Sequence, residues 1–160
     1  MLAYSYNRLS IDVTSTIKLW DPFTGQQQAN IKVADIDIEN TQSGIGWDYL
    51  SSLSWNPQGS HLLAVIEYHA GLLLEPDLTV DTTFILDDGF NYGSWRPDGT
   101  QILFSTGNLN SPSSDYPSTR QLRIWDVEQR QFIPTVLSER NNILRAYWNP
   151  DGESATLVDW

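Results

Sequence analysis

The chain has 160 residues, with 9 Lys and Arg against 20 Asp and Glu, which gives a formal net charge of −11. That charge repels polyanions, so we expect neither a nucleic-acid partner nor an anionic membrane surface. There is no Cys, which excludes disulfides, thiolate nucleophiles and Cys-based zinc sites. Residues 1–20 lack a signal peptide, and a genuine start at Met1 would indicate a cytoplasmic protein.

Apolar and alternating runs predict short strands along the whole chain, and no segment has the spacing of an amphipathic helix. Seven Trp and seven Tyr favour the same conclusion, because aromatic residues are enriched in sheets. The strands are expected, in four groups, at 1–7, 14–21 and 29–38; at 49–55, 61–68, 71–75 and 79–86; at 90–95, 101–106, 119–126 and 131–137; and at 143–148 and 154–160.

One turn motif occurs three times, as Trp-Asn-Pro-Gln-Gly at 55–59, Trp-Arg-Pro-Asp-Gly at 95–99 and Trp-Asn-Pro-Asp-Gly at 148–152. Pro presets the backbone for the second position of a type I turn, and Gly takes the left-handed position that restores strand pairing. An apolar run follows each copy. Each copy therefore predicts a strand, a tight turn and an antiparallel strand.

A second motif ends in Trp-Asp, as Ile-Lys-Leu-Trp-Asp at 17–21 and Leu-Arg-Ile-Trp-Asp at 122–126. Leu74-Glu75 takes its place in the middle unit. Trp55 and Trp95 are 40 residues apart, whereas Trp95 and Trp148 are 53 apart, and the extra 13 match a Ser-, Pro- and Asn-rich insertion at 107–119. These spacings indicate a repeat with one long insertion.

A unit of 40 residues with Trp-Asp at the end of its third strand resembles the WD-repeat family of β-propellers, and the Trp-x-Pro-Asp-Gly turns are similar to TolB-type repeats. The resemblance implies an all-β fold of antiparallel four-stranded blades, about three in number and forming an incomplete ring. The blades are expected at 1–39 without the innermost strand, at 48–88, at 90–138, and at 143–160 with the two inner strands only. The Gly-His pair of the family is missing, so these blades are expected to rely on packing.

An incomplete ring would expose apolar blade faces, which soluble monomers avoid. Two explanations stay open: additional blades from a longer chain, or self-association of this one. The Trp residues at repeat-equivalent positions are expected in the core, namely Trp20, Trp55, Trp95, Trp125 and Trp148.

We expect no catalytic, cofactor-binding or metal-binding residues. Asp35, Asp37 and Glu39 alternate with Ile and indicate a solvated outer strand face rather than a cation site. His61 and His69 are too far apart along a strand to share a metal. The chain contains neither a Gly-x-Ser-x-Gly elbow nor a nucleotide-binding loop.

The predicted function is a non-catalytic β-propeller scaffold whose loops bind a protein or a peptide. Loop length varies on one face of the propeller, where Trp47, Asp115 and Tyr116 are the expected binding residues. The acidic surface favours a basic partner. The alternative is an accessory propeller portion of a larger enzyme, a hydrolase or a kinase, whose catalytic domain lies outside this chain.

Overall fold

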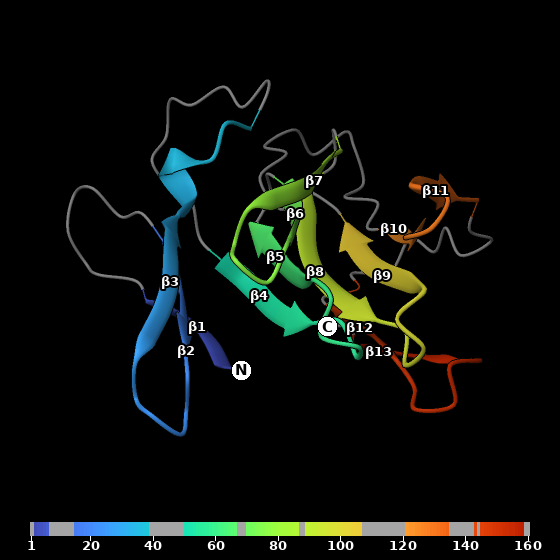
Figure 1. Cartoon of the computed structure of the whole chain (residues 1–160). Helices are drawn as coiled ribbons and strands as arrows, with labels where there is room; N and C mark the ends of the chain where they lie inside the picture. Colours follow the sequence, from blue (N-terminus) through green and yellow to red (C-terminus); the bar gives the residue numbers. More distant parts are fainter. Residues whose placement is uncertain are drawn as a thin grey trace.

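The computed structural model describes residues 2–6, 15–38, 50–66, 70–86, 89–106, 121–134, 143 and 145–158. In these residues the chain folds into four antiparallel sheets, and Figure 1 shows the first three following one another across the view. The described residues contain one 3₁₀ turn and no α-helix. None of their helical segments is long and apolar enough to cross a membrane. The predicted fold class, antiparallel four-stranded sheets of an incomplete β-propeller, is confirmed.

Each sheet is a meander in which consecutive strands pair. The first contains β1 (Leu2–Tyr6), β2 (Thr16–Trp20) and β3 (Gln27–Lys32). The second contains β4 (Leu50–Trp55), β5 (Leu62–Ile66), β6 (Ala70–Leu74) and β7 (Val80–Ile85). The third contains β8 (Phe90–Trp95), β9 (Gln101–Thr106), β10 (Gln121–Asp126) and β11 (Gln131–Ile133), and the fourth β12 (Arg145–Trp148) and β13 (Ala155–Val158).

One expected strand is wrong in part. The strand expected at 29–38 ends at Lys32, and the 3₁₀ turn η1 (Val33–Asp35) follows it. The turn places Val33 in the core at 2% exposure, and the Val33 amide donates to the Ser15 carbonyl at 2.9 Å. Asp35 and Asp37 are exposed as expected, but they do not lie on a strand face, and Glu39 lies outside the described residues.

The core fills the spaces between neighbouring sheets. Ile17 and Leu19 of β2 pack against one face of the second sheet, and its other face packs against the third sheet. Residues of β5 alternate between these two clusters, with Leu62, Ala64 and Ile66 in one and Leu63 and Val65 in the other. A strand covered on both faces is apolar throughout, and this explains the continuous run in β5.

The second sheet contacts the third directly at Gly93. A Cβ atom at this position would lie 2.7 Å from Cδ2 of Leu63 and 3.1 Å from Cε1 of Phe104. Phe104 in turn packs edge-on against Phe90, with ring centroids 4.9 Å apart. The absence of a side chain at Gly93 therefore lets the aromatic residues of this interface fill the space between the sheets.

Two expectations about the blades have different outcomes. Of the five Trp residues expected in the core, Trp95 is buried at 8% exposure, and Trp20, Trp55, Trp125 and Trp148 are half-buried. The blade limits 1–39, 48–88, 90–138 and 143–160 stay predictions, because most of these limits fall on residues that the structure does not describe.

Candidate functional site

The residues expected to bind a partner, Trp47, Asp115 and Tyr116, lie outside the described residues. Their role stays a prediction. The connections that the structure does describe in full are the turns at the opposite end of the strands. In Figure 1 two of them, between β2 and β3 and between β12 and β13, point to the bottom of the view. We call this end of the molecule the turn face.

Three inner turns, at 56–61, 96–100 and 149–154, carry the Trp-x-Pro motif and share one backbone shape. Their glycines, Gly59, Gly99 and Gly152, have φ values of 73°, 71° and 69°. In each turn the glycine amide donates to the carbonyl of the residue before Pro, at 2.8 to 2.9 Å. The left-handed backbone explains why Gly occupies this place in every copy.

The inner turns also contact one another across the sheets. Asn56 Nδ2 donates to the Gly99 carbonyl at 3.2 Å, and the equivalent Arg96 Nε donates to the Gly152 carbonyl at 2.9 Å. We call these two the turn-to-turn bonds. Gly99 and Gly152 are buried beneath them, whereas Gly59 is exposed. In this part of the chain, the residue before Pro therefore joins its own turn to the turn of the next sheet.

Three outer turns, at 21–26, 75–79 and 127–130, place a left-handed residue near their end. This residue is Gly25, Leu78 and Arg130, with φ values of 68°, 71° and 51°. Leu78 is buried in the cluster between the first and second sheets, and Arg130 Nη2 donates to Thr82 Oγ1 of the second sheet at 2.6 Å. The side chains of both non-glycine residues therefore contact a neighbouring sheet. These contacts offset the energetic cost of a left-handed backbone, which residues with a side chain rarely adopt.

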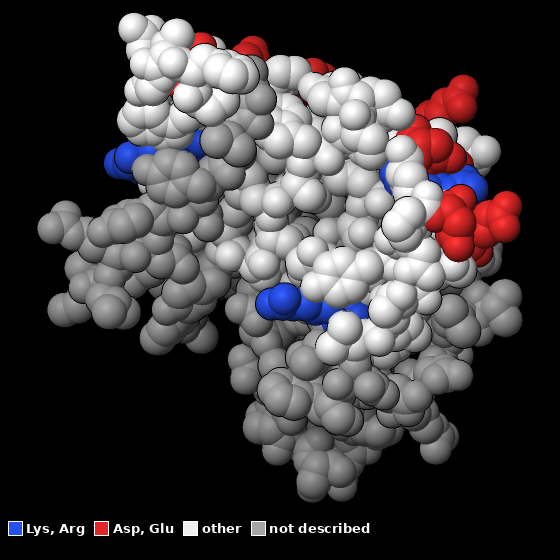
Figure 2. Space-filling view, turned by 90° about the horizontal axis from the view of Figure 1, so that it is seen from below, with Lys and Arg blue, Asp and Glu red and all other residues white. Residues whose placement is uncertain are grey.

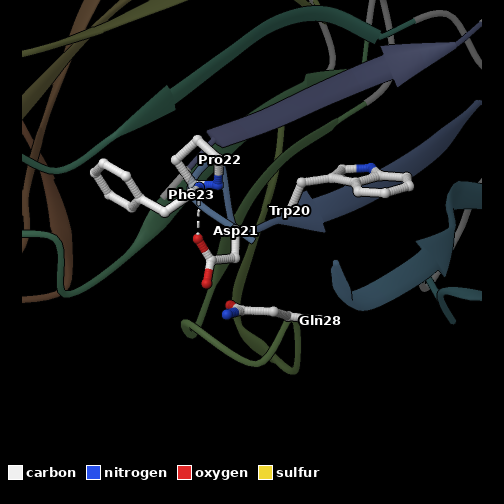
Figure 3. Close-up of a pocket in the computed structure, with 5 residues that line it drawn as sticks. All are labelled: Trp20, Asp21, Pro22, Phe23 and Gln28. Atoms are coloured by element: carbon white, nitrogen blue, oxygen red, sulfur yellow. Dashed lines mark hydrogen bonds between the residues drawn. The ribbon is translucent and has the colours of Figure 1, made fainter. Parts of the chain in front are cut away.

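The outer turn of the first sheet borders a pocket of about 140 Å³ that is lined by Trp20, Asp21, Pro22, Phe23 and Gln28. Figure 3 shows the Trp20 ring and the Phe23 ring on opposite sides of the Asp21 carboxylate, with the Gln28 amide below it. Phe23 is 98% exposed, the highest value among the exposed large apolar residues of the described chain. Sequence analysis did not single out this residue.

The Asp21 carboxylate holds the outer turn in shape. Its Oδ1 accepts the Phe23 amide at 2.8 Å and the Thr24 amide at 3.3 Å. The bond from the Phe23 amide, followed by the bond from the Thr24 side chain, lowers the pKa of Asp21 below its ordinary value. The pocket therefore combines apolar walls with an ionised carboxylate at neutral pH.

The same place in the third sheet is covered. Trp125, the counterpart of Trp20, packs against Phe84 of the second sheet with ring centroids 4.6 Å apart and against its own neighbour Phe132 at 5.0 Å. In the first sheet the residue paired with Trp20 is Gln27 rather than an aromatic residue. The first sheet thus lacks the pair of aromatic residues that receives a neighbouring sheet in the third.

A second polar group lies where the second and third sheets meet. His61 Nε2 is 3.5 Å from Glu75 Oε1, and Arg130 Nη1 is 3.4 Å from Asp81 Oδ1. Donor atoms of His61, Glu75 and Asp81 all lie within 4.8 Å of one another. The spacing of His61 and His69 in the sequence does not reveal this cluster, because its three residues belong to different strands and turns.

Acidic side chains on the turn face lie mainly at its edges. Figure 2, seen from below, shows several of them at the right edge around a basic group and others along the top, while uncharged residues cover most of the described surface. Asp98 and Asp151 each occupy an inner turn and accept a backbone amide two residues further on, at 3.0 and 2.8 Å. These backbone bonds are the main reason why the pKa values of both carboxyls are lowered.

Together, the sheets define a protein of the β-propeller class. The chain is similar to the WD40 domain of Neurospora crassa Pan2, with a TM-score of 0.62 and 12% identity, over 96% of this chain and 45% of that one. It is also similar to the tricorn protease, with a TM-score of 0.59 and 10% identity, over 97% of this chain and 14% of that one. The chain thus spans less than half of either structure. No family model matches the sequence, and no curated protein does.

Proposed function

We propose that this chain is part of a non-catalytic β-propeller scaffold with WD-type repeats, and that it binds a basic peptide segment of a protein partner at the pocket beside Phe23. The observation that carries the proposal is the exposure of Phe23, which is 98%, at a pocket that also contains an aromatic wall and a carboxylate. Exposed aromatic residues beside a pocket are enriched at protein interfaces.

The chemistry of the pocket favours a Lys or Arg side chain of the partner. The aliphatic part of such a side chain packs on Pro22 and Phe23, while its charged end approaches the Asp21 carboxylate. The net charge of −11 adds a long-range attraction for basic segments. A peptide fits this place better than a further sheet does. Gln27, which pairs with Trp20, stands where the third sheet has Phe132, the residue against which Phe84 of the second sheet packs.

The test is a selection of displayed peptides on the intact chain, followed by measurement of the Kd of the enriched peptides. We expect Lys- and Arg-containing peptides to be enriched, and Phe23→Ala to weaken their binding about tenfold or more, as is typical of an interface anchor. Ile85→Ala is the matched control, because Ile85 is an exposed apolar residue of another sheet. Equal affinity of the Phe23→Ala and Ile85→Ala variants would refute the pocket as the binding place.

The predicted loop face is a separate proposal. There we propose binding by Trp47, Asp115 and Tyr116, and a replacement of residues 108–118 by a short Gly-containing turn tests the role of Asp115 and Tyr116 on the same enriched peptides. Loss of binding in that replacement, with Phe23→Ala still binding, would transfer the function from the pocket to the loops. The role of an accessory propeller in a larger enzyme stays the alternative, and the reading frame on both sides of this chain decides it.

A further inference from the structure

The cluster of His61, Glu75 and Asp81 brings one imidazole nitrogen and two carboxylates together at the edge of the second sheet. Their donor atoms lie within 4.8 Å of one another, and His61 Nε2 and Glu75 Oε1 are 3.5 Å apart. We propose that these three residues bind a divalent transition-metal ion of the zinc type. The proposal does not depend on the peptide pocket, which lies on the first sheet.

Strand pairing explains how the cluster forms. Leu62 of β5 lies opposite Leu74 of β6, so His61 and Glu75, one residue beyond each strand, are cross-strand neighbours. On the next pair, Leu73 faces Thr82 and Leu74 faces Val80, which leaves Asp81 as the extra residue of a β-bulge. Bulges redirect the side chain of the extra residue. Here the bulge accompanies the placement of Asp81 beside His61 and Glu75.

Neighbouring hydroxyl groups contact the second nitrogen of His61 and the second oxygen of Asp81, which are the atoms that would not bind the metal. The Ser60 hydroxyl lies 3.0 Å from His61 Nδ1, so Nε2 is the nitrogen that faces the carboxylates. The Thr82 hydroxyl donates to Asp81 Oδ2 at 2.7 Å. Groups that bond the second nitrogen of a metal-binding His, or the second oxygen of a carboxylate, orient the ligand in known sites.

The donor set and its spacing indicate the class of ion. Tetrahedral zinc with bonds of 2.0 to 2.2 Å separates its ligand atoms by about 3.3 to 3.6 Å, which the His61–Glu75 distance already matches. Zinc binding would require the donor atoms to close in from the 4.8 Å range within which they lie, and the Glu75 side chain is 44% exposed. A mixed nitrogen and oxygen set suits zinc, cobalt or manganese, whereas calcium and magnesium prefer oxygen ligands.

Arg130 distinguishes a metal site from a structural ion pair, because it lies next to Asp81. Its guanidinium lies 3.4 Å from Asp81 Oδ1 and its side chain is 57% exposed, so it already supplies a positive charge at one ligand. A metal ion has to share Asp81 with this cation or displace it. Replacing Arg130 by Gln should therefore strengthen metal binding several-fold, since like charges repel. A purely structural ion pair would show no such gain.

The first measurement uses the wild-type chain and Zn²⁺ alone. The chain has two His residues, so proton NMR gives two sets of imidazole signals, which the His61→Gln or the His69→Gln variant assigns. We expect Zn²⁺ to shift the His61 signals and to leave those of His69 in place. Mg²⁺ at the same concentration should shift neither. No shift of His61 at saturating Zn²⁺, or equal shifts of both residues, would overturn the proposal.

Titration calorimetry with Zn²⁺ then compares matched variants. Glu75→Gln should weaken binding about tenfold or more, because it removes a ligand. Glu153→Gln removes an exposed carboxylate from another turn and should leave the affinity unchanged. Arg130→Gln should bind more tightly than the wild type, with Arg130→Lys close to the wild type. Weaker binding in Arg130→Gln, or equal losses in the two Glu variants, would contradict the site.

Discussion

Strands β5 and β13 both follow a Trp-x-Pro turn, yet every residue of β5 is buried and every residue of β13 is exposed. β5 pairs with strands on both sides and lies between two sheets, whereas β13 pairs with β12 alone among the described strands. The repeat motif therefore determines the backbone of a hairpin, while the neighbouring sheets determine how much of it is buried.

The largest expected effect separates two residues of the same type. Phe104→Ala should lower the free energy of unfolding by about 3 to 5 kcal/mol, because Phe104 is fully buried between the second and third sheets. Phe23→Ala should change it by less than about 0.5 kcal/mol, because Phe23 is 98% exposed. Urea denaturation of both variants measures the difference. Similar losses would show that the outer turn of the first sheet is also packed.

The two left-handed residues of the outer turns give the next contrast. Leu78→Gly should lower the free energy of unfolding by about 2 to 4 kcal/mol, since it empties a buried position. Arg130→Gly should stay within about 1 kcal/mol of the wild type, because Gly relieves the backbone strain while exposed hydrogen bonds are lost. The same denaturation experiment applies. A large loss in Arg130→Gly would mean that its contacts to Asp81 and Thr82 matter more than their exposure indicates.

A smaller effect concerns the residue before Pro in two inner turns. Asn56→Ala should lower the free energy of unfolding by about 1 to 3 kcal/mol, because Asn56 is 4% exposed and its amide satisfies the Gly99 carbonyl. Asn149→Ala should lose less than about 1 kcal/mol, since Asn149 bonds only within its own hairpin among the described residues, to Ser154 and Thr156. Thermal unfolding of the pair tests whether the turn-to-turn bond stabilises the sheets.

The smallest effect is a dependence on pH. The folded pKa values of Asp98 and Asp151 are lower than their ordinary values, so their bonds stabilise the fold above the unfolded pKa of about 4. This stabilisation is lost as the pH falls through the folded pKa. We expect Tm to decrease on acidification below about pH 4, and to decrease less in Asp98→Asn, which lacks one of the titrating groups. An unchanged acid response in that variant would contradict the assignment.

Much of the fold follows from local chemistry that is visible in the sequence. The Pro and Gly of the inner turns predicted β8 and β9 with the bounds that the structure shows. The strand expected at 29–38 was too long because Val33 turns into the core, and the contact with Ser15 that accompanies this turn lies outside the local pattern. Of the strand expected at 131–137 the structure describes residues 131–134, in which Gln131–Ile133 form β11 and Pro134, which has no amide to donate, follows directly.

The candidate sites were harder to predict, for two physical reasons. The position of Asp81 depends on a β-bulge, and alternation along one strand does not show where an extra residue enters the pairing. Whether the pocket beside Phe23 is covered depends on which sheet packs against β2. The local sequence does not show this, because it is decided by the arrangement of all the sheets. His61 and Glu75 carried one usable signal, because His61 directly precedes Leu62 and Glu75 directly follows Leu74, and these two leucines are opposite each other in one hairpin.

The turn-to-turn bonds have a consequence for how such a chain can change in evolution. The unit of the third sheet has both a donor before its Pro, Arg96, and an acceptor on its Gly, Gly99, and the two face opposite neighbours. A tandem duplication of one unit would therefore supply the new copy with both halves of the contact, without any further substitution. The identity of the donor can also change, since Asn56 and Arg96 both make this bond at equivalent places. A gene of this kind can gain or lose whole repeats while the turn-to-turn bonds between neighbouring sheets are preserved.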